Sequence, residues 1–438
     1  MRQLTSQLLL YGNVAREGTI LAELAHIAGQ ASCLENGDPA PLRRRFYDQI
    51  RRLLELATLC GFDQNLWHNY IAYLVATDEN PFSLTCERVG ATPEASVNLF
   101  AVHDFEIFQQ LFSYDFTALE KRLGVECFSI LENYRAIPKR EGAYNRGISR
   151  RIQALSQALE KCATPGAFFH VVTDFYRQHG VGEFAFNHAF RLRKAGDAPL
   201  EFLPVNNLDS LGLDGLVGYE RQKSLLRENT LAFLAGKRAN NVLLYGDSGT
   251  GKSTSVKALA HDYGDYGLRM IEIYKHQFRE LPELVARIKN RRYRFILVMD
   301  DLSFEEHEVE YKYLKAVIEG GVERKPENLL VYATSNRRHL VREKWSDRED
   351  MEHDGDIHRS DTMEEKLSLA ERFGLAILYG NPSKKEYEAI LQAIAQRNGV
   401  ELTPARLALA TQWEIQHGGF SGRTAQQFIQ SLEGKDEA

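Results

Sequence analysis

The second half of this sequence predicts an α/β fold with a parallel sheet, preceded by a mainly helical region. Short apolar runs alternate with helical patterns from about residue 216 onward, which is typical of βαβ units. A glycine-rich turn joins one apolar run to a helix at 246–253. Another run, beginning at Arg294, ends in Asp300 and Asp301, as expected of a strand that is buried on both faces.

Composition indicates a globular protein of two or three domains in 438 residues. Hydrophobic residues make up 44%, charged residues 26%, and the formal net charge is −6, which does not favour a general nucleic-acid binder. The start of the chain lacks a secretion signal, and no run reaches the roughly 20 apolar residues of a membrane span. We therefore expect a cytoplasmic protein without a membrane partner.

The cysteines are odd in number and widely spaced, which favours reduced thiols over a disulfide framework or a zinc site. They are Cys33, Cys60, Cys86, Cys127 and Cys162.

Residues 1–195 are predicted to form a helical N-terminal domain whose role the sequence does not reveal. Apolar residues recur at helical spacing, and aromatic residues gather at 105–116 and 184–190. Such stripes are usually core, although a partner groove is the alternative. Short basic runs at 43–45 and 139–140 could contact nucleic acid. Solvated surface charge is the simpler interpretation.

The remaining domain boundaries follow from composition and periodicity. We expect a linker at 196–215, an α/β core at 216–382 and a small helical lid at 383–438. A capping box at Ser383 and Glu386, and Thr403 followed by Pro404, predict helix starts in the lid. Five parallel strands are predicted in the core, at 242–245, 268–274, 294–299, 329–336 and 375–379.

The turn after the first of these strands fits the P-loop pattern G-x-x-x-x-G-K-[ST] at every fixed position. Its glycines let successive backbone N–H groups point into one concavity, and the following helix adds its positive dipole end. Lys252 can reach the β- and γ-phosphates, and the Ser253 hydroxyl can ligate Mg²⁺. The alternative is a chance glycine turn. The predicted nucleotide-binding residues here are Gly246, Asp247, Ser248, Gly249, Thr250, Gly251, Lys252, Ser253 and Thr254.

Polar side chains lie at the ends of two further predicted strands. Asp300 is the expected second Mg²⁺ ligand, because a carboxylate there can hold the ion that bridges the phosphates. Asp301 could polarise the attacking water as general base. Asn336, whose amide both donates and accepts, could hold that water or the γ-phosphate. An acidic strand end and a turn asparagine are the alternatives.

Two later arginines could stabilise charge on the γ-phosphate. Arg372 precedes the fifth strand, and Arg423 enters the last helix. Either could instead form a surface salt bridge. No Asn-Lys-x-Asp segment follows the P-loop, which favours adenine over guanine as the base.

These motifs, in this order over about 211–432, resemble the AAA+ ATPase superfamily. The resemblance implies that 246–253 is Walker A, that 295–301 is Walker B and that Asn336 is sensor 1. It also implies an arginine finger at Arg372 and a sensor 2 arginine at Arg423. The segment Leu216-Val217-Gly218-Tyr219-Glu220 resembles the one that lies against adenine. The motifs Gly-Asp-Ser-Gly-Thr-Gly-Lys-Ser and Asp-Asp-Leu-Ser-Phe are closest to an uncharacterised bacterial AAA+ family catalogued as a domain of unknown function.

Two departures from the superfamily pattern bear on activity. AAA+ proteins usually carry Glu where this chain has Asp301, and the shorter carboxylate predicts slow turnover unless a loop compensates. The segment 274–278 runs almost directly into a helix, without the aromatic-glycine loop of AAA+ unfoldases, which argues against polypeptide threading. An acidic insert at 342–363 holds His353 and His358. We interpret it as a solvated loop rather than a metal site.

We therefore predict an ATP-binding protein that hydrolyses MgATP to drive or gate remodelling of an unidentified protein client. Arg372 acting in trans implies a homo-oligomeric ring or partial ring. The first alternative is a nucleotide-gated binding or scaffold module with little turnover. The second is a small-molecule P-loop kinase, which predicts no dependence on Arg372 and no assembly with ATP.

Overall fold

The computed structural model describes residues 1–33, 38–136, 146–205, 211–304, 310–319, 325–336 and 369–433. The chain divides into two compact units, Met1–Asn187 and His188–Ala438. The predicted acidic insert at 342–363, with His353 and His358, lies outside the described residues. Among the helices described, none combines the length and apolar character needed to cross a lipid bilayer.

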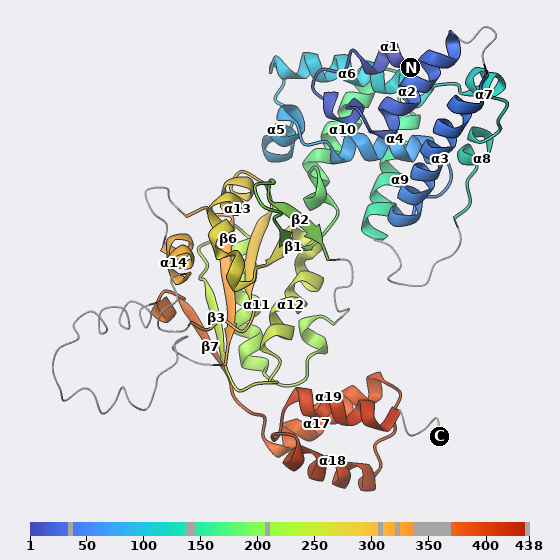
Figure 1. Ribbon diagram of the computed structural model, residues 1–438. Coiled ribbons are helices and arrows are strands. Elements are labelled where there is room, and N and C mark those ends of the chain that lie inside the picture. The colour runs from blue at the N-terminus through green and yellow to red at the C-terminus, as the bar shows by residue number, and fades with distance from the viewer. Residues whose placement is uncertain are drawn as a thin grey trace. The chain divides into compact units, whose positions relative to one another are not determined.

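The first unit is built from helices, as predicted (Figure 1). Their bounds are α1 Arg2–Thr5, α2 Ile20–Ser32, α3 Ala40–Cys60, α4 Leu66–Thr77, α5 Pro81–Val89, α6 Val97–Phe112, α7 Thr117–Leu123, α8 Phe128–Glu132, α9 Arg146–Glu160 and α10 Pro165–His179. The aromatic stripe on α6 is buried, with Phe105, Phe108 and Leu111 fully enclosed. The core interpretation of this stripe is therefore confirmed.

A buried carboxylate ties the start of the chain to α6. Asp104 accepts hydrogen bonds from the backbone N–H groups of Leu9, Leu10 and Tyr11 at 2.8–3.1 Å. Charge-assisted bonds of this kind are about twice as strong as neutral ones. They fix a non-helical segment that would otherwise leave its amides unsatisfied.

The second unit is a sheet with helices on both faces, followed by a group of helices. The strands are β1 Ala189–Arg193, β2 Glu201–Pro204, β3 Val242–Gly246, β4 Leu268–Glu272, β5 Arg294–Met299, β6 Leu329–Ser335 and β7 Leu375–Tyr379. The helices are α11 Glu220–Leu234, α12 Lys252–Tyr263, α13 Leu281–Ile288, α14 Tyr311–Glu319, α17 Lys384–Arg397, α18 Pro404–Gln416 and α19 Gly422–Glu433.

The sheet has seven strands in the order β2-β1-β4-β5-β6-β3-β7, so the prediction of five was wrong. The five predicted strands are present and pair in parallel. The two extra strands form an antiparallel hairpin, and β1 pairs in parallel with β4. Residues 189–193 lie within the predicted helical region, and residues 201–204 lie within the predicted linker. Both segments belong to the sheet, because apolar side chains such as Phe190 and Phe202 are buried there.

One face of the sheet is covered by α11 and α12, while α14 lies on the other side (Figure 1). Leu226 of α11 and Val256 of α12 share a core with Ile296, Val298 and Tyr332 of the sheet. Because successive side chains of a strand point to opposite faces, positions 296, 298 and 300 share the α12 side. So do positions 330, 332 and 334 of β6.

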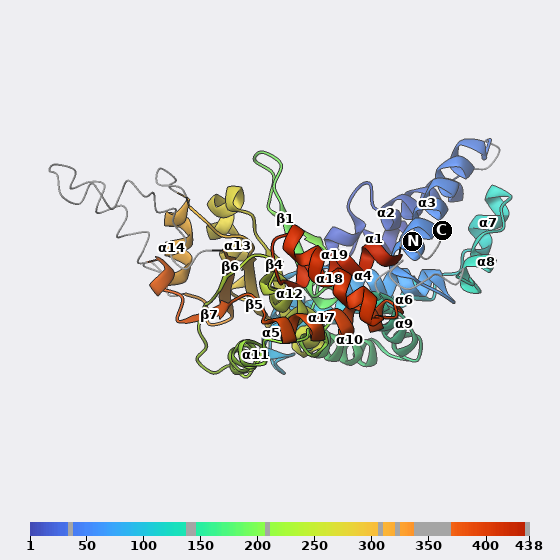
Figure 2. The same ribbon diagram turned by 90° about the horizontal axis from the view of Figure 1, so that it is seen from below.

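The C-terminal helices α17, α18 and α19 pack side by side as their own group (Figure 2). Ser383 and Glu386 form the predicted capping box at the start of α17. Thr403 caps α18, with Pro404 as its first residue. The predicted helix starts are therefore confirmed.

Candidate functional site

The P-loop joins the end of β3 to the start of α12, and its backbone requires glycine. Gly246 and Gly249 have φ angles of 129° and 75°. A Cβ atom on Gly246 would lie 2.2 Å from the carbonyl oxygen of Tyr379. The turn is thus held tightly against β7, and the Asp247 amide donates to the same carbonyl at 2.9 Å.

Lys252 is the first residue of α12, and its ammonium group lies inside the P-loop. Its Nζ donates to the carbonyl oxygens of Gly246 at 3.0 Å and Asp247 at 2.6 Å, and to Oδ1 of Asn336 at 3.1 Å. The residue is only 6% exposed. Burial lowers the pKa of Lys252, against the opposing effect of the nearby Asp247 and Asp301. Phosphate oxygens would supply the counter-charge that such a lysine needs.

The two predicted Mg²⁺ ligands lie in contact, although Ser253 belongs to α12 and Asp300 follows β5. The Ser253 hydroxyl donates to Oδ1 of Asp300 at 2.5 Å. The Thr334 hydroxyl donates to the same oxygen at 2.5 Å. Mg²⁺ prefers oxygen ligands and is commonly held by one or two carboxylates together with substrate phosphates. The donors present here therefore fit that ion.

Asp301 and Asn336 are joined beside the lysine. The Asn336 amide donates from Nδ2 to Oδ1 of Asp301 at 3.0 Å, so its side chain bridges Lys252 and Asp301. Asp301 has a φ angle of 51°, a left-handed conformation in which Asp and Asn are enriched. Residues from the start of α12 and from the ends of β5 and β6 thus converge on one point.

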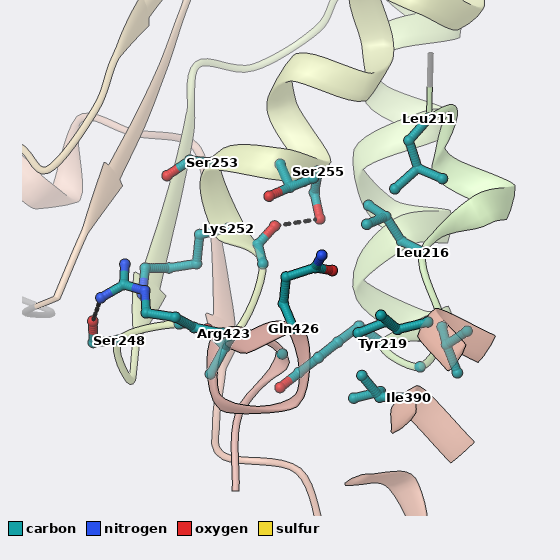
Figure 3. Close-up of a pocket in the computed structure, with 18 of the residues that line it drawn as sticks. Leu211, Leu216, Tyr219, Ser248, Lys252, Ser253, Ser255, Ile390, Arg423 and Gln426 are labelled. Atoms are coloured by element: carbon teal, nitrogen blue, oxygen red, sulfur yellow. Dashed lines mark hydrogen bonds between the residues drawn. The ribbon is translucent and has the colours of Figure 1, made fainter. Parts of the chain in front are cut away.

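A cavity of about 860 Å³ opens beside these groups (Figure 3), a volume within the usual range for small-molecule sites. Residues 248–255 line its polar end together with Asp300, Asp301 and Asn336. The other end holds most of the apolar lining, which consists of Leu211, Leu216, Val217, Tyr219, Ile390 and Ile394. Lys223 and Arg397 also line the cavity there, bonded to the carbonyl oxygens of Leu216 and Gly215. The cavity therefore has a polar end beside the P-loop. Its apolar end is lined by the segment that precedes α11 and by α17.

The two predicted arginines lie in different places. Arg423, at the start of α19, lines the cavity, and its Nη1 donates to Oγ of Ser248 at 3.4 Å (Figure 3). Arg372 does not line the cavity but forms an ion pair with Glu319 of α14. The structure therefore brings Arg423 to the P-loop of its own chain and does not bring Arg372 there.

The segment between β7 and α17, residues 380–383, is bonded to the P-loop and to Tyr219 in the wall of the cavity. Asp247 accepts from the Asn381 amide at 2.9 Å. Tyr219 donates its hydroxyl to the carbonyl oxygen of Gly380 at 2.8 Å, and its ring stacks on Tyr379. The P-loop and the start of the C-terminal helices are thus connected through Asp247.

Among the predicted nucleotide-binding residues, Ser248 to Thr254, Val217 and Gly218 line the cavity. Gly246 and Asp247 instead hold the turn onto β7 and the segment that follows it. Thr334, beside Asp300, and Ile390 and Ile394, on α17, also line the cavity and are not among the predicted residues. Thr334 and Tyr332 are the hydroxyl-bearing residues in the run 329–334, whose other residues are aliphatic. The small hydroxyl of Thr334 at the strand end is a usable signal, because buried polar groups require partners. The isoleucines carry no comparable signal.

The site thus has the arrangement of a P-loop α/β fold: a strand, a glycine turn and a helix, with acids at the end of a nearby parallel strand. The chain belongs to the family described as "Protein of unknown function (DUF815)", whose model matches residues 185–436. That range corresponds closely to the second unit. The predicted relation to a family catalogued as a domain of unknown function is confirmed.

The solved structures to which the chain is similar match about half of it. The RuvB Holliday junction branch migration motor of Thermotoga maritima is 16% identical, with a TM-score of 0.36 over 51% of this chain and 64% of that chain. The FIGL-1 AAA domain in complex with ADP is 17% identical, with a TM-score of 0.35 over 50% of this chain and 70% of that chain. No curated protein matches the sequence.

Proposed function

We propose that this protein is an AAA+-type ATPase that binds MgATP and hydrolyses it to ADP and phosphate. The carrying observation is the convergence of Lys252, Asp301 and Asn336 beside the glycine turn, with hydrogen bonds linking all three side chains. A P-loop alone supports phosphate binding. An acid and an amide next to its lysine support an attack on the terminal phosphate as well.

In this proposal each side chain has one task. Backbone N–H groups of the P-loop and Lys252 hold the phosphates. Asp301 takes a proton from the attacking water, and Asn336 orients that water or the γ-phosphate. Ser253 and Asp300 would hold Mg²⁺, which neutralises charge on the phosphates. Arg423 adds positive charge from the C-terminal helices, which we propose act as a lid.

The apolar end of the cavity supports a purine base, and the missing guanine-selecting segment favours adenine. The rings and branched side chains of Tyr219, Val217 and Ile390 can bury an aromatic base. Their position next to the P-loop accommodates a nucleotide with its phosphates in the turn. We therefore propose ATP as the nucleotide.

Calorimetry of the full chain with ATP and Mg²⁺ tests the proposal. We expect saturable binding of MgATP in one site per chain and a weaker response to MgGTP. Phosphate release above the background of a Lys252→Ala chain is expected in the same preparation. If the folded chain shows no heat of binding with millimolar MgATP, the proposed function is wrong.

A nucleotide-gated binding or scaffold module with little turnover is the second candidate. The observation in its favour is that Asp301 is short and already engaged by Asn336. A carboxylate misplaced by about 1 Å can cost about 10²-fold in rate. Under this candidate, ATP binding would switch the position of the lid and engage an unidentified client without rapid hydrolysis.

Replacing Asp301 with glutamate separates the two candidates. If Asp301 is the working base, Asp301→Glu is expected to lower phosphate release by about 10²-fold, because the carboxylate moves and glutamate is disfavoured at a φ of 51°. If the protein is a switch with a base that is too short, the same change raises turnover from the background level. Steady-state phosphate release distinguishes these opposite directions.

Asp301→Asn is the matched control, because asparagine tolerates the left-handed conformation and can keep a hydrogen bond to Asn336. This variant is expected to bind ATP with nearly unchanged affinity and to lose turnover. Thermal unfolding of both variants checks that the fold is intact. Undiminished hydrolysis by Asp301→Asn would contradict the general-base role.

A further inference from the structure

Thr334 of β6 lies beside Asp300 and Asp301, the two acids of the site. The ladder pairs Met299 of β5 with Ala333 of β6, so Asp300 comes next to Thr334. Both positions point to the α12 side of the sheet by the alternation of strand side chains. Thr334 is 2% exposed. Its hydroxyl therefore depends on protein partners.

The hydroxyl makes two hydrogen bonds with two consecutive residues. It donates to Oδ1 of Asp300 at 2.5 Å and accepts from the backbone N–H of Asp301 at 3.0 Å. The carbonyl oxygen of Thr334 also accepts from the Leu302 amide at 2.7 Å. The turn that carries both acids is thus bonded to one residue of the neighbouring strand.

These bonds fix what each acid presents to the cavity. Oδ1 of Asp300 receives the hydroxyls of Ser253 and Thr334, while Oδ2 has no hydrogen bond from any residue that the structure describes. For Asp301, the bond to its N–H stabilises the backbone at the point where φ is 51°. Residues that orient a metal ligand commonly affect metal affinity by about 10–100-fold when changed.

We propose that Thr334 is the positioning residue of this site: its hydroxyl orients Asp300 for Mg²⁺ and sets the backbone from which Asp301 projects. This inference rests on the proposed function, since it assigns Thr334 a role in binding MgATP. It goes further, because it predicts that metal dependence is controlled from β6, by a residue outside the P-loop and outside the acid pair.

A purely structural role is the competing interpretation. Threonine is favoured in strands because its side chain is β-branched, and valine has the same branched shape without the hydroxyl. Comparison of Thr334→Val with Thr334→Ser therefore separates shape from hydrogen bonding. Valine keeps the shape and removes both bonds, whereas serine keeps the hydroxyl and removes a methyl group.

The test measures the affinity of the full chain for ATP by calorimetry, once with excess Mg²⁺ and once in EDTA. We expect Thr334→Val to weaken binding in Mg²⁺ by at least 10-fold and binding in EDTA by less than about 2-fold. Thr334→Ser is expected to remain within about 3-fold of wild type in both conditions, because its hydroxyl can make the same bonds. The readout is the dissociation constant in Mg²⁺ divided by the dissociation constant in EDTA. A loss of stability alone would weaken binding in both conditions and would leave this ratio unchanged.

Thr230→Val is the matched control. Thr230 is another buried threonine of the same unit, and its hydroxyl bonds the carbonyl of Leu226 and the hydroxyl of Tyr332, away from the cavity lining. The ratio of its dissociation constants in Mg²⁺ and in EDTA is expected to equal that of wild type. If Thr334→Val does not fold, Thr334→Cys provides a weaker donor of similar size, and an increase of at least 5-fold in the ratio is expected.

The outcomes distinguish this inference from the proposed function. Wild-type chain that binds ATP in neither condition overturns both. Wild-type chain that binds MgATP, with Thr334→Val showing the same ratio as Thr230→Val, overturns the role of Thr334 alone. A Thr334→Ser chain that behaves like Thr334→Val also overturns it, because the hydroxyl would then not be the decisive group.

Discussion

A Lys252→Ala chain is expected to bind ATP at least about 10²-fold more weakly than wild type and to release no phosphate above background. Lys252 is the buried cation of the P-loop, and its Nζ already lies among the oxygens of Gly246, Asp247 and Asn336. A charge-assisted contact worth about 3 kcal/mol corresponds to two tenfold steps in affinity. Calorimetry and a phosphate-release assay measure the two losses separately.

Lys257→Ala is the control for this change. Lys257 lies on the same helix, is exposed, pairs with Glu272 at 3.6 Å and does not line the cavity. Its removal is expected to leave ATP binding within about 2-fold of wild type, as for most exposed surface charges. Equal affinities for the Lys252→Ala and Lys257→Ala chains would show that the P-loop is not the nucleotide site.

The second large effect is expected from Arg372→Ala, which should lower the maximal rate of hydrolysis by about 10³-fold with little change in ATP affinity. Arg372 is held by Glu319 and does not line the cavity of its own chain. If it acts, it acts on the nucleotide of a neighbouring chain. The expected signature is a lower rate at saturating ATP, with little change in the ATP concentration that gives half of the maximal rate.

Mixing two inactive variants tests this trans action directly. A Lys252→Ala chain keeps Arg372, and an Arg372→Ala chain keeps its P-loop. Assemblies that contain both should regain part of the activity, because some neighbouring pairs hold one intact copy of each. Arg193→Ala, which removes an exposed ion pair with Glu201, should remain fully active alone. A mixture with no more activity than its components would argue against Arg372 as a trans-acting group.

The part of the site that lies at the ends of strands can be predicted from the sequence alone. In a parallel sheet all carboxyl ends lie at one edge, so residues following apolar runs meet there regardless of strand order. This explains why the P-loop, Asp300, Asp301 and Asn336 were predicted together and lie together. The five predicted strands are also present, because four of them are mainly apolar runs and the one that begins at Leu268 alternates apolar and polar residues.

The remaining features depend on tertiary neighbours that no local pattern specifies. Strands β1 and β2 are short; β1 carries Arg191 and Arg193, and β2 begins with Glu201 and ends in Pro204, so neither has the long apolar run that marks most of the other strands. The bond from Thr334 to Asp300 requires β6 to lie directly beside β5, and several strand orders are compatible with the sequence. The approach of Arg423 to Ser248 spans 175 positions of chain, which periodicity cannot reveal.

The bond between Asp247 and Asn381 has a thermodynamic consequence. Asp247 belongs to the P-loop, and Asn381 lies in the short stretch from which α17 begins. Free-energy coupling between two parts of a protein is reciprocal. If phosphate in the turn shifts the preferred position of α17–α19, then any molecule that immobilises those helices must alter the affinity for phosphate by an equal factor. On the proposed function, a molecule bound to these helices would therefore set the nucleotide state without touching the nucleotide.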